Sequence, residues 1–284
     1  MAIQKVKDRI YVEVEYQGAN VSAVDTSGGL VLIDIPGLPR ELRHWLGELR
    51  RLTGKDTAYL VNTDHHFDHA LSSSLVTQNV IAHELSRQET LQPGRNLIHL
   101  AEFWREVDSA GVDEMLRIEQ GLPRITFRDR MRLYLGDATF ELIYFGGHSP
   151  ATIAAYLVED KVLFAGDNVE SNVHPYKGQA CFRDWITAIE KIMLMDVDVI
   201  VPGHGPVCDM AEAARMLSYF RQLWDQVKSL YDRGYSRDEV VKRLQPMQSY
   251  YPIDPAIEKR TRDRFDQGTA RLYDEIAALY GGGY

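Results

Sequence analysis

Cysteine is scarce in this chain. Cys181 and Cys208 are its only two, and they do not form a closely spaced pair, so no disulfide framework is expected. The chain also lacks a run of about 18 apolar residues, the length that a membrane-spanning helix needs. Its first residues, MAIQKVKDRIYVEVEY, lack the apolar core of a secretion signal. These absences predict a soluble, cytoplasmic protein without a membrane partner.

Positive charge is also in short supply. The 32 Lys and Arg residues are outnumbered by 41 Asp and Glu residues, which gives a formal net charge of −9. Nucleic-acid binding draws mainly on clustered Lys and Arg, so we expect a small-molecule substrate and no nucleic-acid partner. A homo-oligomer is compatible with this composition. With 284 residues, 45% of them hydrophobic, the chain can form either one large catalytic domain or a domain of about 200 residues with an extension.

Apolar residues follow strand and helix periodicities in turn. Alternating or short apolar runs predict strands at 10–16, 30–35, 58–61, 131–135, 139–145, 152–158, 162–165 and 197–201. Helical spacing predicts helices over 38–52, 85–120, 185–195 and most of the chain after about residue 210. Because strands often come in adjacent runs, we expect sheets packed face to face with helices outside. We predict a catalytic domain over 1–210 and a helical extension over 211–284.

Potential metal ligands follow the ends of four predicted strands, each near glycine. They occur in the segments Asp64-His65-His66-Phe67-Asp68-His69, Gly146-Gly147-His148, Gly166-Asp167 and Gly203-His204. Glycine permits the sharp loops that bring ligands close to the backbone. Imidazole and carboxylate are the ligands of hydrolytic zinc sites. A single histidine more often caps a helix or binds a carbonyl group, but the fourfold repetition of this pattern favours a metal site.

The order Asp64-x-His66-x-Asp68-His69, His148, Asp167 and His204 resembles the metallo-β-lactamase superfamily. That family has a His-x-His-x-Asp-His motif followed by Gly-His, Gly-Asp and Gly-His loops. The segments GGLVLIDIPG, VIAHELSR, KVLFAGDN and VIVPGHGPV are similar to it as well, and the resemblance covers about residues 8–220. It implies an α/β (α+β) fold, a four-layer αββα sandwich with a metal site at one edge of the sheets, here followed by a C-terminal helical extension.

The resemblance also implies the ligand set. The first metal would be bound by Asp64, His66 and His148, the second by Asp68, His69 and His204, and Asp167 would bridge them. The cofactors would be two divalent ions, zinc in the first place, with manganese or iron as alternatives. A bridging hydroxide is the expected nucleophile, because a bound metal lowers the pKa of water. Asp68 would be the catalytic residue that orients it. The implied reaction is hydrolysis of an ester, lactone, thioester or amide-type bond.

Asp64 departs from the family pattern, which has histidine at this position. Three interpretations are open: Asp64 ligates directly, it binds through a water molecule, or the first site is weakened or empty. Direct ligation would place three carboxylates on two divalent ions, and a hydroxide would then make the site neutral. In such a site we expect the metal-bound water to be less acidic, and we expect harder metal ions to occupy the site in a greater proportion.

Other readings of the sequence compete with hydrolysis. One is a redox di-metal enzyme, although such relatives typically have Glu where this chain has His66 and carry a flavin domain. Another is a nuclease, but these usually insert a large domain between the third and fourth motifs. A third is a non-catalytic or mononuclear relative with a modified first site. His174 and Tyr176, in the segment after Asp167, are candidates for substrate contact, with ordinary loop packing as the alternative.

Overall fold

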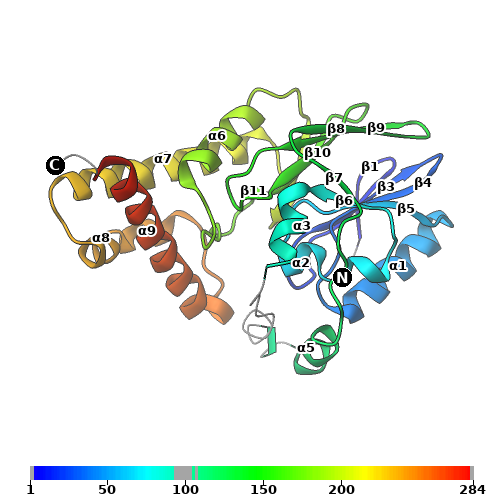
Figure 1. Ribbon diagram of the computed structural model, residues 1–284, viewed down its shortest axis with the longest axis horizontal. Coiled ribbons are helices and arrows are strands. Elements are labelled where there is room, and N and C mark those ends of the chain that lie inside the picture. Colours follow the sequence, from blue (N-terminus) through cyan, green and yellow to red (C-terminus); the bar gives the residue numbers. More distant parts are fainter. Residues whose placement is uncertain (1–2, 93–103, 106–107, 282–284) are drawn as a thin grey trace.

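Two β-sheets form the centre of the molecule in the computed structural model, which describes residues 3–92, 104–105 and 108–281 (Figure 1). The seven-stranded sheet has the order β1-β2-β3-β4-β5-β6-β7. Its strands are Gln4–Lys7, Ile10–Glu13, Val21–Thr26, Gly29–Ile33, Thr57–Val61, Val80–His83 and Ile125–Phe127. The five-stranded sheet has the order β12-β11-β10-β9-β8. In chain order, its strands β8 to β12 are Arg130–Leu135, Ala138–Tyr144, Ile153–Leu157, Val162–Glu170 and Val199–His204.

Helices cover the outer faces of the two sheets. Helix α1 (Pro39–Thr53) buries Trp45 and Leu49 in an apolar cluster with β3, β4 and β5. Helix α6 (Phe182–Ile192) buries Trp185 and Ile189 in a cluster with the other sheet. Between the sheets lies a third cluster, to which both contribute, Val31 from one and Phe164 from the other. The predicted αββα sandwich is confirmed.

Parallel strand pairs bring the site to one edge of both sheets. Strands β4 and β5 are parallel, as are β11 and β12, whereas β8 to β11 are antiparallel. The carboxyl ends within each parallel pair therefore lie together. Two backbone hydrogen bonds join the sheets here, from Asn20 N to Gly203 O (2.7 Å) and from Ile153 N to Thr63 O (2.8 Å). The segments that carry the predicted ligands converge at this junction.

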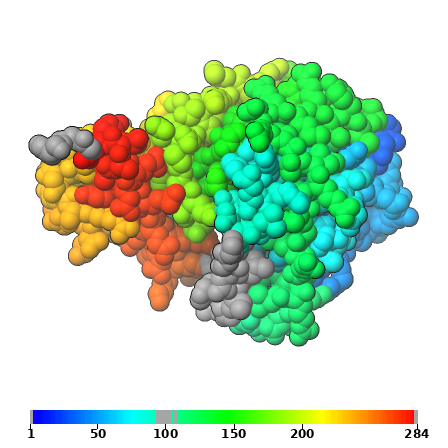
Figure 2. Space-filling model, viewed as in Figure 1, coloured from blue at the N-terminus to red at the C-terminus, as the bar shows by residue number. Residues whose placement is uncertain are grey.

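The chain after β12 is helical, as predicted. Its elements are α7 (Met210–Asp232), α8 (Arg237–Arg243), η2 (Gln245–Tyr250), η3 (Pro255–Ile257) and α9 (Glu258–Tyr280). Phe220 of α7 and Leu272 of α9 share the apolar cluster of α6, and Figure 2 shows these helices packed directly against the rest of the molecule. The boundary at residue 210 coincides with the start of α7 and stays a prediction, since one apolar core extends across it.

Several elements differ from the sequence-based expectation. Strands β1, β3, β6 and β7 were not predicted. The predicted helical stretch 85–120 contains α3 (Glu84–Thr90) and α5 (Ser109–Met115), while residues 93–103 and 106–107 lie outside the described residues. Strand β11 continues to Glu170, so Asp167 lies within a strand and not after one. Two short helices follow β5, α2 (Phe67–Ala70) and η1 (Ser73–Leu75).

The described residues contain no helix that combines the length and the apolar character needed to cross a membrane.

The packing of α9 predicts unequal effects of two substitutions on that helix. Leu272 is fully buried in the core, whereas Leu279 is 43% exposed. Leu272→Ala should lower the free energy of unfolding by about 2–5 kcal/mol because it leaves a cavity. Leu279→Ala should change it by less than about 0.5 kcal/mol. Urea unfolding followed by circular dichroism measures both, and equal effects would contradict the packing of α9 described here.

Candidate metal centre

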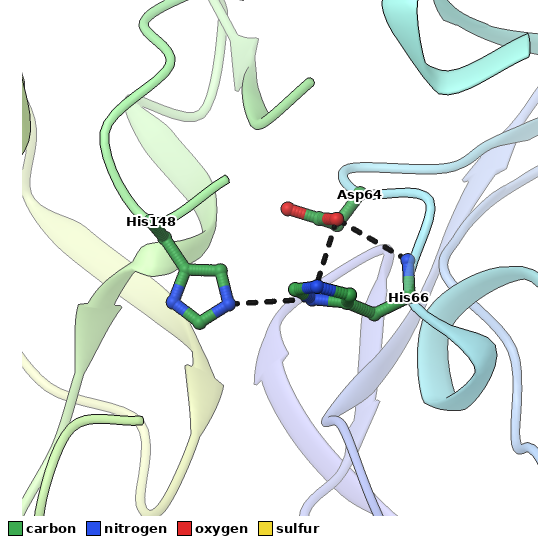
Figure 3. Close-up of side chains that lie close together, drawn as sticks. All are labelled: Asp64, His66 and His148. Atoms are coloured by element: carbon green, nitrogen blue, oxygen red, sulfur yellow. Dashed lines mark hydrogen bonds and ion pairs between the residues drawn. The ribbon is translucent and has the colours of Figure 1, made fainter. Parts of the chain in front are cut away.

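Seven side chains predicted as ligands meet at the joined edges of the sheets. Two groups of three each have ligand atoms within 4.8 Å of one another, Asp64 with His66 and His148, and Asp68 with His69 and His204. The first group converges from two separate loops (Figure 3). These are the two groups that the sequence analysis expected.

Asp167 lies between the two groups. Its Oδ2 is 3.1 Å from His148 Nε2, and its Oδ1 is 3.3 Å from His69 Nε2 and 3.4 Å from His204 Nε2. Glycine is required beside it, because a Cβ on Gly203 would lie 1.9 Å from Asp167 Oδ1. Oδ2 of Asp167 therefore faces the first group and Oδ1 faces the second group, as expected for a bridging ligand.

The donor atoms fit a metal. Within the described residues, the buried atoms His69 Nε2 and Asp167 Oδ1 have no hydrogen-bond partner, an arrangement that is unfavourable unless something else binds them. Burial raises the pKa of Asp167, but the neighbouring His69, His204 and His148 outweigh it and hold the pKa well below its usual range. Burial likewise opposes protonation of His204, yet Asp167 raises its pKa to about 9. A divalent cation would replace these protons and bind the same atoms.

Three of the imidazoles are oriented by a hydrogen bond at the ring nitrogen that points away from the centre. His69 Nδ1 lies 2.9 Å from Asp34 Oδ2, and His204 Nδ1 lies 3.0 Å from the carbonyl oxygen of Gly18. His66 Nε2 lies 2.7 Å from Gln179 Oε1. Such partners fix the tautomer and the orientation of metal-binding histidines. The inward-facing atoms are thus Nε2 of His69 and His204 and Nδ1 of His66.

Asp34 is the most constrained of these partners. It follows β4 with a φ of 55°, a conformation that aspartate tolerates better than most residues. Its carboxylate also accepts hydrogen bonds from Thr63 N (2.7 Å) and Thr63 Oγ1 (2.5 Å). The sequence analysis missed Asp34. The available signal was an aspartate directly after a buried strand, like the motif that begins at Asp64.

The Asp64 carboxylate is held by four donors. Its Oδ1 accepts from the backbone N of His65 (2.7 Å) and His66 (3.2 Å), and its Oδ2 accepts from Ser149 Oγ (2.7 Å) and Thr152 Oγ1 (2.6 Å). A carboxylate has about four acceptor positions, so a direct bond to metal would compete with one of these contacts. Asp64 therefore ties its own loop to the loop of His148, and its direct ligation stays a prediction.

Glu170 was also missed by the sequence analysis. With His148 and Asp167 it forms a third group of closely spaced potential ligands, and its Oε1 lies 3.9 Å from His148 Nδ1. Burial, with the nearby Asp167, raises the pKa of Glu170 to about 8. Glu170 is three positions after Asp167, and in a regular strand this spacing would put the two side chains on opposite faces. The irregular pairing of β11 with β12 after Gly166 is what brings both to the centre.

His174 and Tyr176, the candidate substrate contacts, lie beside the centre. His174 Nε2 donates to Gln248 O (2.7 Å), and burial lowers the pKa of His174 to about 4. The Tyr176 ring centroid is 6.3 Å from that of His148. Both side chains line a cavity that His204 also lines. Their contact with substrate stays a prediction.

Comparison with known proteins identifies the family. The profile of the metallo-β-lactamase superfamily matches residues 16–204. The chain belongs to this superfamily. It is 25% identical over 258 residues to a linear primary-alkylsulfatase from a Pseudomonas strain, covering 78% of this chain and 49% of that protein. It is 23% identical to the metallo-β-lactamase type 2 of Elizabethkingia meningoseptica, covering 80% and 88%.

Solved structures of the superfamily share the fold. The sec-alkylsulfatase Pisa1 from Pseudomonas superimposes with a TM-score of 0.76 at 16% identity, covering 99% of this chain and 51% of that one. The chain thus spans about half the length of the alkylsulfatases that it matches. The matched members of the superfamily include hydrolases that act on different bonds, so membership establishes the fold and a relation to hydrolases but not a substrate.

The orientation of His69 predicts the effect of changing Asp34. Asp34→Asn keeps the size of the side chain and suits the positive φ, but it removes the negative charge that faces His69 Nδ1. We expect zinc affinity to fall by about 10- to 100-fold, the effect typical of losing such a partner. Competition with a chromogenic chelator measures it. Asp25→Asn, which removes a carboxylate paired with Lys55, is the control, and equal affinities of both variants would contradict the role of Asp34.

The network around Asp64 predicts a loss confined to the first group. Asp64→Ala removes the acceptor for Ser149, Thr152 and the backbone of the His66 loop, whether or not Asp64 touches the metal. We expect about one metal per chain in place of about two, with the His69 and His204 group still loaded. Asp64→His should retain both and favour zinc over manganese. Elemental analysis after gel filtration measures the content, and full occupancy of Asp64→Ala would refute this view of the first site.

Proposed function

We propose that this protein is a hydrolase that cleaves an ester-type or amide-type bond with two divalent metal ions, zinc in the first place. The observation that carries the proposal is Asp167, whose two oxygens face His148 on one side and His69 with His204 on the other. Two ions held there would activate water and polarise the bond to be cleaved. Ester, lactone, thioester, amide-type and sulfate-ester bonds all suit this chemistry.

The surrounding residues have distinct roles in this proposal. Asp34, Gln179 and the carbonyl group of Gly18 hold the imidazoles in one orientation, so the ligand atoms need no rearrangement when metal binds. Asp64 holds the His66 and His148 loops together through Ser149 and Thr152. These contacts preorganise the centre, which reduces the cost of reorganisation during the reaction.

Asp68 is placed to act on the attacking water. It lies in the first turn of α2, and its Oδ2 is 3.7 Å from His204 Nε2. Its side chain is 16% exposed, whereas that of Asp167 is 4% exposed, so Asp68 is the carboxylate of the pair that substrate and water can reach. The backbone of Gly18 lies close to Asp68, because a Cβ on Gly18 would lie 2.7 Å from Asp68 Cβ. This close approach restricts the positions that the Asp68 side chain can take. We assign Asp68 the orientation of the nucleophile.

Asp68→Asn should lower turnover by about 10²- to 10⁴-fold, because the amide cannot accept a proton. The assay is hydrolysis of 4-nitrophenyl esters and of alkyl sulfates by zinc-loaded protein, with activity lost on chelation and restored by zinc. Asp232→Asn, on the exposed end of α7, should retain normal turnover. Near-normal turnover of Asp68→Asn on a substrate that wild type hydrolyses would refute the assigned role. No metal-dependent hydrolysis by wild type of any substrate in the panel would refute the proposed function.

A further inference from the structure

Residues 171–181 connect β11 to α6 and form neither a helix nor a strand. Regular pairing does not satisfy the backbone groups of such a segment, so other contacts must fix its path. The path matters here, because Gln179 lies near the end of this segment and its Oε1 is 2.7 Å from His66 Nε2. Gln179 is exposed, so its position depends on how its backbone is held and not on packing around its side chain.

Arg271 of α9 binds the backbone that carries Gln179. It donates from Nε to the carbonyl oxygen of Ala180 (2.5 Å) and from Nη2 to the carbonyl oxygen of Gln179 (3.2 Å). The planar guanidinium group presents its donors in a fixed arrangement and can bind two acceptors at once. One side chain of the C-terminal extension therefore holds two successive carbonyl groups of the segment.

Glu275 of α9 binds the chain a little further on, at the beginning of α6. Its Oε2 accepts from Phe182 N (2.8 Å), and its Oε1 accepts from Arg183 N (3.0 Å). These backbone groups belong to the first turn of α6, where N–H groups have no partner within the helix. Glu275 and Arg271 are four residues apart, so they lie on the same face of α9 and hold the segment at two neighbouring points.

The same segment also contacts the loop of His148. Cys181 N donates to the carbonyl oxygen of Gly147 (2.9 Å), and Gly147 directly precedes His148. A Cβ on Gly147 would lie 2.7 Å from Trp185 Cα, so this loop and α6 approach each other closely. The segment therefore reaches both histidines of the first group, one through a side chain and the other through the backbone.

The histidines of the second group have their partners elsewhere. His69 Nδ1 faces Asp34, and His204 Nδ1 faces the carbonyl oxygen of Gly18. These partners lie in loops near the N-terminus of the chain, far in sequence from α9. The superfamily profile ends its match at residue 204, so α9 lies beyond it. The extension thus supports one group of ligands and not the other.

We propose that Arg271 and Glu275 are positioning residues for the first metal-binding group, so that α9 sets the metal affinity of that group chiefly through Gln179. They act on the imidazole of His66 by holding the backbone of the segment. The proposal rests on the metal centre of the proposed function, but its readout is metal affinity and not turnover. A purely structural role of the two residues would instead weaken both groups alike.

Stepwise zinc affinities, measured by competition with chromogenic chelators, test the proposal. Arg271→Met removes the donors but keeps an apolar stem of similar length. We expect the zinc Kd of the first group to rise about tenfold, the lower end of the range for residues that orient ligands, and Arg271→Lys to restore part of the affinity. Unchanged affinity of the first group in Arg271→Met, or a wild type that binds only one zinc, would overturn the proposal.

Glu275→Gln is an independent variant of the same contact, which serves also if Arg271→Met fails to fold. It keeps the size of the side chain but replaces one of the two acceptor oxygens, so the zinc Kd of the first group should rise at least threefold. Asp274→Asn is the matched control, because Asp274 is the neighbouring residue of α9 and pairs with Arg237 instead. Equal affinities of Glu275→Gln and Asp274→Asn would contradict the role of Glu275.

A His66→Ala background separates the two groups. This substitution removes a ligand of the first group together with the partner of Gln179, so the zinc that remains belongs to the second group. Adding Arg271→Met should change the Kd of that zinc less than about threefold. A tenfold loss here as well would overturn the proposal, because it would show a structural role of Arg271 that extends to the whole centre.

A double-mutant cycle tests the route through Gln179. Gln179→Met and Arg271→Met interrupt the same path, so their combined effect on the zinc Kd of the first group should be smaller than the product of the single effects. Effects that multiply in full would overturn this route. Two zinc sites with an Arg271-dependent first site, in a protein that hydrolyses nothing, would support the inference while refuting the proposed function. Metal-dependent hydrolysis with affinities indifferent to Arg271 would do the reverse.

Discussion

The centre of this molecule depends on one carboxylate surrounded by imidazoles. Asp167 is almost fully buried and lies within 3.4 Å of His69, His148 and His204. Burying an ionised carboxylate is costly unless it is paired, and no lysine or arginine is among these three neighbours. The rest of the site follows from that requirement: the histidines must be oriented toward Asp167, and the strands that carry them must end at the same place.

The two sheets meet this requirement by joining at one edge. Asp167 lies in β11 and His204 at the end of the parallel strand β12, while His69 follows β5 of the other sheet. The hydrogen bonds from Asn20 to Gly203 and from Ile153 to Thr63 connect the sheets at this point. Asp64 adds a side-chain connection between the same regions through Ser149 and Thr152. Positioning of the ligands is therefore shared between backbone pairing and a few buried polar side chains.

The sequence predicts the candidate ligands of this centre better than the residues that support them. His66, His148 and His204 stand in recognisable motifs, because metal binding restricts both the residue type and its spacing. Asp34 and Gln179 lie 35 and 113 positions from the histidines that they contact. A single polar residue outside a motif carries only a weak local signal, such as the position of Asp34 directly after a buried strand. Glu170 was missed because the predicted strand ends at residue 165 and no recognised motif contains Glu170. In the structure β11 continues to Glu170, with a register shift against β12. Strand β6, Val80–His83, escaped prediction because four apolar or neutral residues next to a helical pattern look like part of that helix.

Helix α9 contributes both to the apolar core and to the wall of the cavity beside the metal centre. One of its faces supplies Phe265, Leu272 and Ile276 to the core beneath α6, and its first turns supply Arg260 and Arg264 to the cavity next to His204. Sequence changes that repack the buried face would shift the helix along or about its axis and carry the arginines with it. The shape of the cavity beside His204 and the conformational stability of this protein are therefore not independent traits, and a change in one during evolution or engineering constrains the other.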